Sequence, residues 1–239
     1  MRKIWNRTTP FVIACVLLLF CIVIGFVYNY YWKNVNHEVI FLHPGLHIKK
    51  NDYGLGIYTS VDIPANTVII KERVNVLQNE FDDHTEYRIR TIKKLLNEKR
   101  SDFLNLTPDK LDDTTNSYNY QDEKIQRLHA KYLPEIDADT LILYLHKLSR
   151  NAFAHKDGSE AITFYETKVN HSCDPNVTYY CESGDDILVF ETTKDIRVGE
   201  ELFNSYLNLN DGSSREERRE HLKFSYGFDC QCERCRNGQ

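Results

Sequence analysis

Three cysteines stand close together near the C terminus, where Cys230, Cys232 and Cys235 form a C-x-C-x-x-C pattern. Thiolates at this spacing can share one tetrahedral zinc ion, with Zn–S distances of about 2.3 Å. A structural zinc site is closed by four ligands, so the trio requires one more cysteine or histidine from elsewhere in the fold. Disulfide bonding is the alternative, but the chain has 7 cysteines, an odd number, and a C-x-C pair is cramped for a disulfide.

A second candidate site is the polar run NHSCDPN at residues 170–176, which lies between two apolar, strand-like stretches. Taken alone, this run is equally consistent with an Asx or proline turn. The chain has no G-x-S-x-G elbow, no Walker loop and no H-E-x-x-H helix. The G-L-G at residues 54–56 lacks the third glycine and the following helix of a dinucleotide-binding loop.

The elements that must position these residues are two strand-rich regions on either side of a helical one. The first region, residues 38–72, contains LHIKK, GIYTS and TVIIKE, and the other, residues 161–206, contains AITFYE, NVTYYCE and DILVFETT. Residues 74–155 instead show apolar residues at helical spacing, which predicts an all-helical insert. A last helix should start at the Ser214/Glu217 capping box and stop at Gly227, just before the cysteine trio.

The N-terminal residues predict one membrane span. Residues 8–32 carry no charge and residues 11–28 are almost wholly apolar, which at about 1.5 Å per residue is enough to cross ~30 Å of hydrocarbon. A cleavable signal peptide is the alternative, but the apolar region exceeds the usual length of about 7–15 residues and no A-x-A-like site follows. We therefore expect a lipid bilayer to be a partner through residues 11–32.

Length and charge limit the remainder of the chain. With 239 residues, of which 27% are charged and 41% hydrophobic, it is long enough for one core of about 200 residues and a smaller N-terminal segment. A net charge of −5 opposes bulk electrostatic capture of nucleic acid. We expect no direct nucleic-acid binding, and a basic or neutral partner instead.

Four blocks, taken together and in order, resemble the SET-domain lysine methyltransferases. They are G-L-G-I at 54–57 with a D-I-P-A turn at 62–65, NHSCDPN, GEEL at 199–202 with a following tyrosine, and YGFDCQCERC at 226–235. The closest resemblance is to the SET and MYND group. The chain departs from that group because it has no MYND cysteine/histidine array, so recruitment through such a finger is not expected.

The resemblance implies a fold class that is mostly β with an α insert. It consists of a SET domain (β-clip) of short sheets around a knot-like core, a helical insert, a zinc-binding post-SET tail and one N-terminal transmembrane helix. The expected domains are an anchor at residues 1–32, a SET domain at 38–227 with its insert at about 74–155, and a post-SET tail at 228–239.

The resemblance also implies S-adenosyl-L-methionine as methyl donor. Glycines without side chains would let the backbone approach this ligand closely, an Asn-His pair would contact its amino-acid and adenine parts, and a phenylalanine would stack on adenine. The positions of this chain that match these contacts are Gly54, Leu55, Gly56, Asn170, His171 and Phe228.

Catalytic and metal roles follow from the same resemblance. Tyr206 matches the catalytic tyrosine, and Phe153 and Tyr226 match residues that line the substrate lysine channel, where aromatic faces suit a cation. Cys173 matches the cysteine that completes the C-terminal trio. One structural Zn²⁺ would then be held by Cys173, Cys230, Cys232 and Cys235.

We therefore expect a membrane-anchored protein-lysine N-methyltransferase whose substrate is a histone or a membrane-proximal protein. The thiolate site and the methyl donor both suit a reducing cytosol, so the domain should face the cytosol. The basic residues that flank the span give a weak bias toward the opposite orientation. The alternatives are a tethered SET-fold binding module without turnover, and a methyltransferase that acts on another amine.

Overall fold

The computed structural model describes residues 39–51, 54–77, 83–111, 118–155, 160–182, 186–207 and 212–238. The predicted membrane anchor at residues 1–32 lies outside these ranges. Among the residues that are described, no helix has both the length and the apolar character needed to cross a bilayer.

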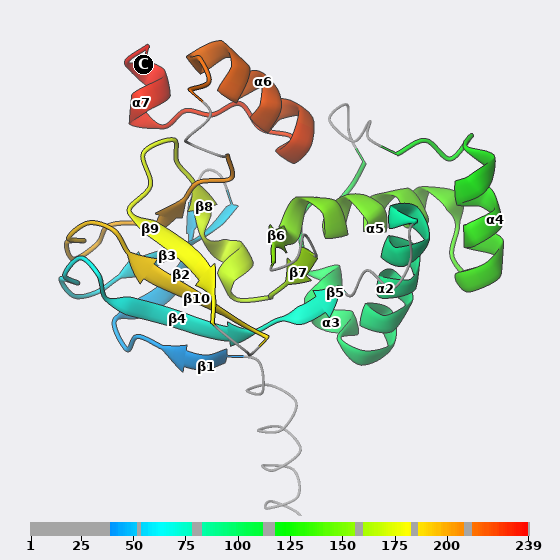
Figure 1. The fold of residues 1–239 in the computed structure, drawn as a ribbon, viewed down its shortest axis with the longest axis horizontal. Helices are drawn as coiled ribbons and strands as arrows, with labels where there is room; N and C mark the ends of the chain where they lie inside the picture. The colour runs from blue at the N-terminus through cyan, green and yellow to red at the C-terminus, as the bar shows by residue number, and fades with distance from the viewer. Residues whose placement is uncertain are drawn as a thin grey trace, which may run out of the picture.

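The largest sheet is antiparallel with the order β1-β4-β10-β9 (Figure 1). Its strands are β1 (Val39–Leu42), β4 (Val68–Arg73), β10 (Ile187–Thr192) and β9 (Val177–Cys181). The first four residues of β10, ILVF, are all buried because this central strand is covered on both faces. The last three of these strands coincide with TVIIKE, DILVFETT and NVTYYCE, which confirms those predictions.

Two smaller pairs of strands carry the G-L-G segment and the NHSCDPN run. β2 (Leu46–Asn51) and β3 (Gly54–Thr59), which contain the predicted segments LHIKK and GIYTS, pair antiparallel, and Gly54 has a φ of 121°, which favours glycine. β8 (Asn170–His171) and β11 (Phe203–Asn204) pair in parallel. This second pairing places the NHSCDPN run beside the segment that leads to Tyr206.

The helices form a lobe with its own apolar core beside the sheets (Figure 1). They are α2 (His84–Glu98), α3 (Arg100–Leu104), α4 (Glu123–Tyr132) and α5 (Ala138–Asn151). Three of them begin at an aspartate whose carboxylate accepts backbone N–H hydrogen bonds, which satisfies donors left free at a helix start. These caps are Asp83 of α2, Asp122 of α4 and Asp137 of α5.

The boundaries of this helical region differ from the expected 74–155. β5 (Asn75–Leu77) and β6 (Ala152–Ala154) lie within that range, and both pair with β7 (Glu160–Ile162) in a three-stranded sheet. An ion pair between Arg88 of α2 and Glu160 of β7 joins the helices to this sheet. The ends of the insert are strands because β7 supplies hydrogen-bonding partners for them from outside the helical segment.

The predicted strand AITFYE is also shorter than expected, since it ends at Ile162 with β7. The chain turns there because the buried carboxylate of Glu72, on β4, accepts hydrogen bonds from the backbone N–H groups of Phe164, Tyr165 and Glu166. These donors cannot then pair with a neighbouring strand. A short 3₁₀ helix, η2 (Glu166–Lys168), follows.

The C-terminal part contains α6 (Arg215–Tyr226) and the short α7 (Glu233–Arg236). The capping box of Ser214 and Glu217 and the left-handed Gly227, with a φ of 80°, are present as predicted. Figure 1 shows α6 and α7 together at the end of the molecule where β8 and β9 are labelled. The tail therefore folds back onto the region of the NHSCDPN run.

Candidate active site

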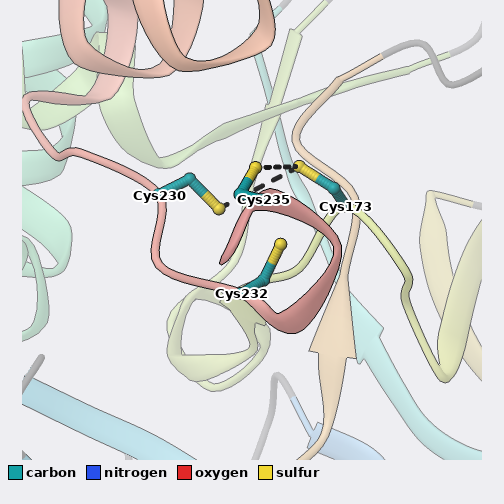
Figure 2. A group of neighbouring side chains, drawn as sticks. All are labelled: Cys173, Cys230, Cys232 and Cys235. Carbon is teal, nitrogen blue, oxygen red and sulfur yellow. Dashed lines mark hydrogen bonds between the residues drawn. The ribbon is translucent and has the colours of Figure 1, made fainter. Parts of the chain in front are cut away.

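Four cysteine sulfurs converge where this tail meets the segment between β8 and β9 (Figure 2). The ligand atoms of Cys173, Cys230, Cys232 and Cys235 all lie within 4.8 Å of one another. The Cys173 sulfur is 3.6 Å from that of Cys235 and 3.9 Å from that of Cys230. Tetrahedral Zn–S bonds of about 2.3 Å place sulfurs about 3.8 Å apart, so the donor set and its spacing fit a zinc ion. The fifth described cysteine, Cys181 on β9, is outside this cysteine cluster.

The cysteines of the cluster differ in how readily they lose a proton, and Cys232 does so more readily than Cys173. Burial raises the pKa of Cys173 to about 11. Burial is the largest single effect on Cys232, but backbone hydrogen bonds from Cys235 and Cys173, together with side-chain hydrogen bonds from neighbouring cysteines, outweigh it and lower the pKa of Cys232 to about 7. The buried guanidinium of Arg218, on α6, adds hydrogen bonds to the sulfurs of Cys173 and Cys235. This arginine has no counterpart among the predicted site residues, and only its charge on the last helix could have drawn attention to it.

His171 lies directly between the cysteine cluster and Tyr206. The backbone N–H of Tyr206 donates to His171 Nδ1 at 3.0 Å, and His171 Nε2 is 3.3 Å from the Cys173 sulfur. Burial, and then the nearby positive charge of Arg218, lowers the pKa of His171 to about 4, so the ring is neutral. Both ring nitrogens therefore have partners within the protein.

Tyr206 follows β11 and is held at both its backbone and its hydroxyl. The hydroxyl donates to the backbone carbonyl of Val169 at 2.9 Å. Burial, with smaller effects of Tyr226 and Glu201, raises the pKa of Tyr206 well above its ordinary value. The hydroxyl consequently stays protonated near neutral pH and can orient a partner by hydrogen bonding, but it cannot act as a base there.

Aromatic rings enclose Tyr206. Its ring centroid is 4.8 Å from that of Tyr226, 5.3 Å from that of His171 and 6.3 Å from that of Phe228. The Tyr226 hydroxyl is 3.4 Å from the Tyr206 carbonyl, to which it donates. Tyr226 and Phe228 belong to the last turn of α6 and the segment after it, so the C-terminal tail completes this enclosure.

Phe153 lies on β6 and packs on a different set of rings. Its centroid is 5.3 Å from that of Tyr179 and 5.9 Å from that of Phe190. Tyr179 lies near both sets of rings. It packs against Phe153, and it is close enough to Tyr226 to raise the pKa of that residue, although burial has the larger effect. Tyr179 was not predicted as a site residue, although strand alternation with the buried Val177 on β9 indicates that it points inward.

A hydrogen-bonded network centred on Glu201 lies beside the G-L-G segment of β3. Glu201 accepts from the side-chain amide of Asn170 at 2.7 Å, from the Tyr58 hydroxyl at 2.7 Å and from the Asn51 amide at 3.0 Å. The Asn170 amide also donates to the Leu55 carbonyl at 3.1 Å. Glu201 is part of the GEEL block, but its role as the centre of a network was not predicted.

Gly56 is required by this network. A Cβ atom placed on Gly56 would come within 2.2 Å of Glu201 Oε1 and 3.1 Å of Asn170 Nδ2. Any side chain here would therefore displace the carboxylate or the amide. The glycine permits the close approach of β3 to Glu201 and Asn170. The close approach of its backbone to a ligand stays a prediction.

Apart from Phe153, which packs against Tyr179 and Phe190, the predicted site residues follow one another through β3, β8, the segment after β11 and the C-terminal tail. Gly54, Leu55 and Gly56 lie on β3 next to Asn170, and His171, the following residue of β8, contacts both Tyr206 and the cysteine cluster. β8 is the element that joins the glycine segment to the aromatic enclosure.

Comparison with known proteins places this site in a family. The sequence model of the SET domain matches residues 54–207, which includes β3, β8 and Tyr206. A SET domain-containing protein of Acanthamoeba polyphaga mimivirus is 31% identical over 214 residues, covering 85% of this chain and 79% of the viral protein.

Two further similarities concern lysine methyltransferases. The N-lysine methyltransferase SMYD2 of Homo sapiens is 29% identical over 116 residues, which are 46% of this chain and 26% of SMYD2. The crystal structure of the SET domain of LSMT bound to lysine and AdoHcy superimposes with a TM-score of 0.62 at 14% identity, covering 87% of this chain and 58% of that one. The chain thus spans only part of the length of these two proteins, and the structural likeness concerns the fold.

Proposed function

The chain belongs to the SET-domain family, and we propose that it is a protein-lysine N-methyltransferase that uses S-adenosylmethionine. The observation that carries this proposal is the position of Tyr206, a half-buried tyrosine whose protonated hydroxyl lies in an aromatic enclosure next to the Asn170–His171 pair. Relatives named lysine methyltransferases, among them SMYD2, support the reaction class.

The methyl donor would lie along β3 and β8. Backbone groups of Gly54, Leu55 and Gly56 are available on β3, and the Asn170 amide is oriented by Glu201 and the Leu55 carbonyl. Phe228 offers a ring face near His171, at 6.0 Å between centroids, for the adenine. His171 would contribute through its backbone, because both ring nitrogens already have partners. When bound, S-adenosylmethionine supplies a methyl group activated by attachment to a sulfonium sulfur.

Transfer of that methyl group requires a neutral, well-oriented lysine amine and a site without water. The Tyr206 hydroxyl donates its one hydrogen bond to the Val169 carbonyl, so its oxygen lone pairs can accept an N–H hydrogen bond from the lysine. This bond would turn the nitrogen lone pair toward the donor's methyl group. The carbon–nitrogen bond would form as the carbon–sulfur bond breaks, and the methylated ammonium would lose its extra proton to solvent once it leaves the site.

Aromatic side chains would guide the lysine to this position. Tyr226 lies against Tyr206, and Tyr179 and Phe153 extend the aromatic surface toward β6. Ring faces attract the lysine cation on its way in and exclude water from the reacting atoms. Tyr226 and Phe153 would therefore line the substrate channel.

A zinc ion in the cysteine cluster would have a structural role. All four ligand positions would be thiolates, which closes the site to water and substrate. The ion would tie the C-terminal tail to Cys173 and so hold Tyr226 and Phe228 in the enclosure.

We further propose that residues 11–32 anchor the protein in a membrane with the catalytic domain, residues 38–227, and the tail, 228–239, facing the cytosol. An observation within the domain supports this orientation. Asn176 lies in an N-x-T glycosylation sequence, yet its amide donates to the Glu201 carbonyl at 2.9 Å and accepts from the Phe203 N–H at 2.7 Å. A glycan is attached at Nδ2, where this half-buried amide already contacts the Glu201 carbonyl, so glycosylation would crowd that hydrogen bond, which favours a compartment without N-glycosylation.

The proposal is tested with the full chain in detergent micelles and S-adenosylmethionine labelled on its methyl group. Core histones and a membrane-protein fraction serve as acceptors, and labelled protein is hydrolysed to amino acids to identify methyllysine. We expect labelled methyllysine with the wild type and none with Gly56→Val, whose side chain would collide with Glu201 and Asn170. Donor binding without any labelled acceptor would favour the tethered binding module, and label on a residue other than lysine would contradict the proposed substrate.

A further inference from the structure

The ring of His171 has no part in the proposed reaction, yet it contacts both the cysteine cluster and the catalytic tyrosine. It is buried, with 8% of its surface exposed, next to Cys173 with 2% exposed. A polar ring in such a place needs partners at both nitrogens, and the structure provides them.

The two partners determine which nitrogen carries the proton. The Tyr206 backbone N–H can only donate, so Nδ1, at 3.0 Å from it, must offer a lone pair. A neutral imidazole then has its single proton on Nε2, which faces the Cys173 sulfur at 3.3 Å. The contact is therefore an N–H···S hydrogen bond in which His171 donates to a cysteine of the cluster.

The same short segment holds Tyr206 at its other end. Val169, two residues before His171, accepts the Tyr206 hydroxyl hydrogen bond, and Cys173 follows two residues after His171. β8 is itself tied to β11 by parallel pairing and by the Ser172 N–H, which donates to the Asn204 carbonyl at 3.0 Å. A change in the position of Cys173 would therefore shift Tyr206 through a segment of only five residues, 169–173, that is held by these hydrogen bonds.

We propose that His171 is a positioning residue that couples the metal-bound cysteine cluster to Tyr206. This inference rests on the proposed function and concerns the same site. The thiolate of Cys173, held by the metal, orients the imidazole through Nε2, and the imidazole orients the Tyr206 backbone through Nδ1. Groups of this kind that donate to or accept from metal ligands commonly change metal affinity by about 10–100-fold.

Two substitutions each remove one of the two hydrogen bonds of the His171 ring and keep the other. An asparagine side chain extends about as far as Nδ1, so His171→Asn can keep an acceptor for the Tyr206 N–H while it loses the bond to sulfur. A glutamine reaches about as far as Nε2, so His171→Gln can keep a donor to sulfur while it loses the acceptor for Tyr206. The exposed His221 of α6 provides matched controls, His221→Asn and His221→Gln.

Three measurements on the full chain in detergent test the proposal. Metal release to a colorimetric chelator should be about tenfold faster or more for His171→Asn and near the wild-type rate for His171→Gln. With metal bound, kcat should fall about tenfold or more for His171→Gln, with little change in KM for the methyl donor. For His171→Asn, kcat should fall by less, about threefold, because this variant keeps the acceptor for the Tyr206 N–H but loses the orientation of that acceptor by the Cys173 sulfur. Nitrogen-15 spectra of the histidine rings should show His171 protonated on Nε2 only.

Several results would overturn the proposal. Equal losses of metal retention and of kcat in both variants would mean that the ring only fills space. A proton on Nδ1 would exclude the N–H···S bond, and wild-type kcat in His171→Gln would exclude support of Tyr206. If the wild type transfers no methyl group, the proposed function fails, whereas the ring spectra and the metal-release rates still decide whether His171 supports the cysteine cluster.

Discussion

Tyr206→Phe separates the chemical role of the hydroxyl from its structural role. The substitution removes one oxygen and one neutral hydrogen bond, the 2.9 Å bond to the Val169 carbonyl. A buried bond of this kind contributes about 0.5–1.5 kcal/mol to the free energy of unfolding, so we expect the variant to be about 1 kcal/mol less stable. The ring and its contacts with Tyr226 and His171 remain.

The loss of catalytic rate should be larger than this. If the hydroxyl orients the lysine amine in the transition state, its removal resembles the loss of one preorganised hydrogen-bonding group, which costs about 10²–10³ in kcat, or roughly 2.7–4 kcal/mol. Donor affinity should change little, because the predicted donor contacts lie on β3, Asn170 and Phe228. The measurements are kcat from single-turnover transfer of labelled methyl groups, donor affinity from calorimetry and stability from urea unfolding.

Tyr180→Phe is the matched control, since Tyr180 is on β9 but has 44% of its surface exposed. It should retain wild-type kcat and stability. A fall in kcat of less than about threefold for Tyr206→Phe, or a fall that the stability loss of about 1 kcal/mol fully accounts for, would refute the assignment of Tyr206 as the orienting group.

Three further predictions concern other parts of the site and the core. Glu201→Ala should weaken donor binding about tenfold, or roughly 1.4 kcal/mol, because Asn170 loses the carboxylate that orients its amide; an unchanged dissociation constant in calorimetry would contradict the network. Burial, with a smaller effect of Glu72, raises the pKa of Glu166 in the folded protein well above the ordinary 4.5. The protonated Glu166 carboxyl therefore contributes fully to the free energy of unfolding below pH 4.5, and this contribution is lost as the pH rises through the raised pKa. Glu166→Gln should therefore be more stable than wild type at neutral pH and less sensitive to pH in urea unfolding, whereas parallel pH profiles would exclude this. Removal of zinc by a chelator should lower the melting temperature and the rate of methyl transfer, and should expose the α6–α7 tail to protease. Added zinc, but not magnesium, should restore all three properties. Full activity without metal would exclude the proposal that zinc holds the tail against Cys173.

Local sequence determined those elements whose stabilising contacts lie within a few residues. The Ser214/Glu217 capping box and Gly227 define the ends of α6 through hydrogen bonds between near neighbours in the chain. The hairpin of β2 and β3 and the central strand β10 follow from apolar patterns bounded by turn residues. The trio Cys230, Cys232 and Cys235 was also recognisable, because its spacing alone suits one metal ion.

Only the tertiary structure decided which distant residues meet. Parallel pairing of β8 with β11 brings Asn170–His171 to Tyr206, and the returning tail brings the trio to Cys173. The family resemblance anticipated these encounters, but no local pattern specifies them. The Glu201 network, Arg218 and Tyr179 were missed for this reason, since their partners lie far away in the sequence.

Long-range hydrogen bonds likewise decided the strand ends. The segment AITFYE has a strand pattern, but the Glu72 carboxylate captures the N–H groups that a longer strand would need. Residues 75–77 and 152–154 lie within the predicted helical insert, yet they form strands because β7 lies between them and pairs with both. A backbone segment takes the conformation in which its N–H and C=O groups are satisfied, and where the partners are remote, only the assembled fold supplies them.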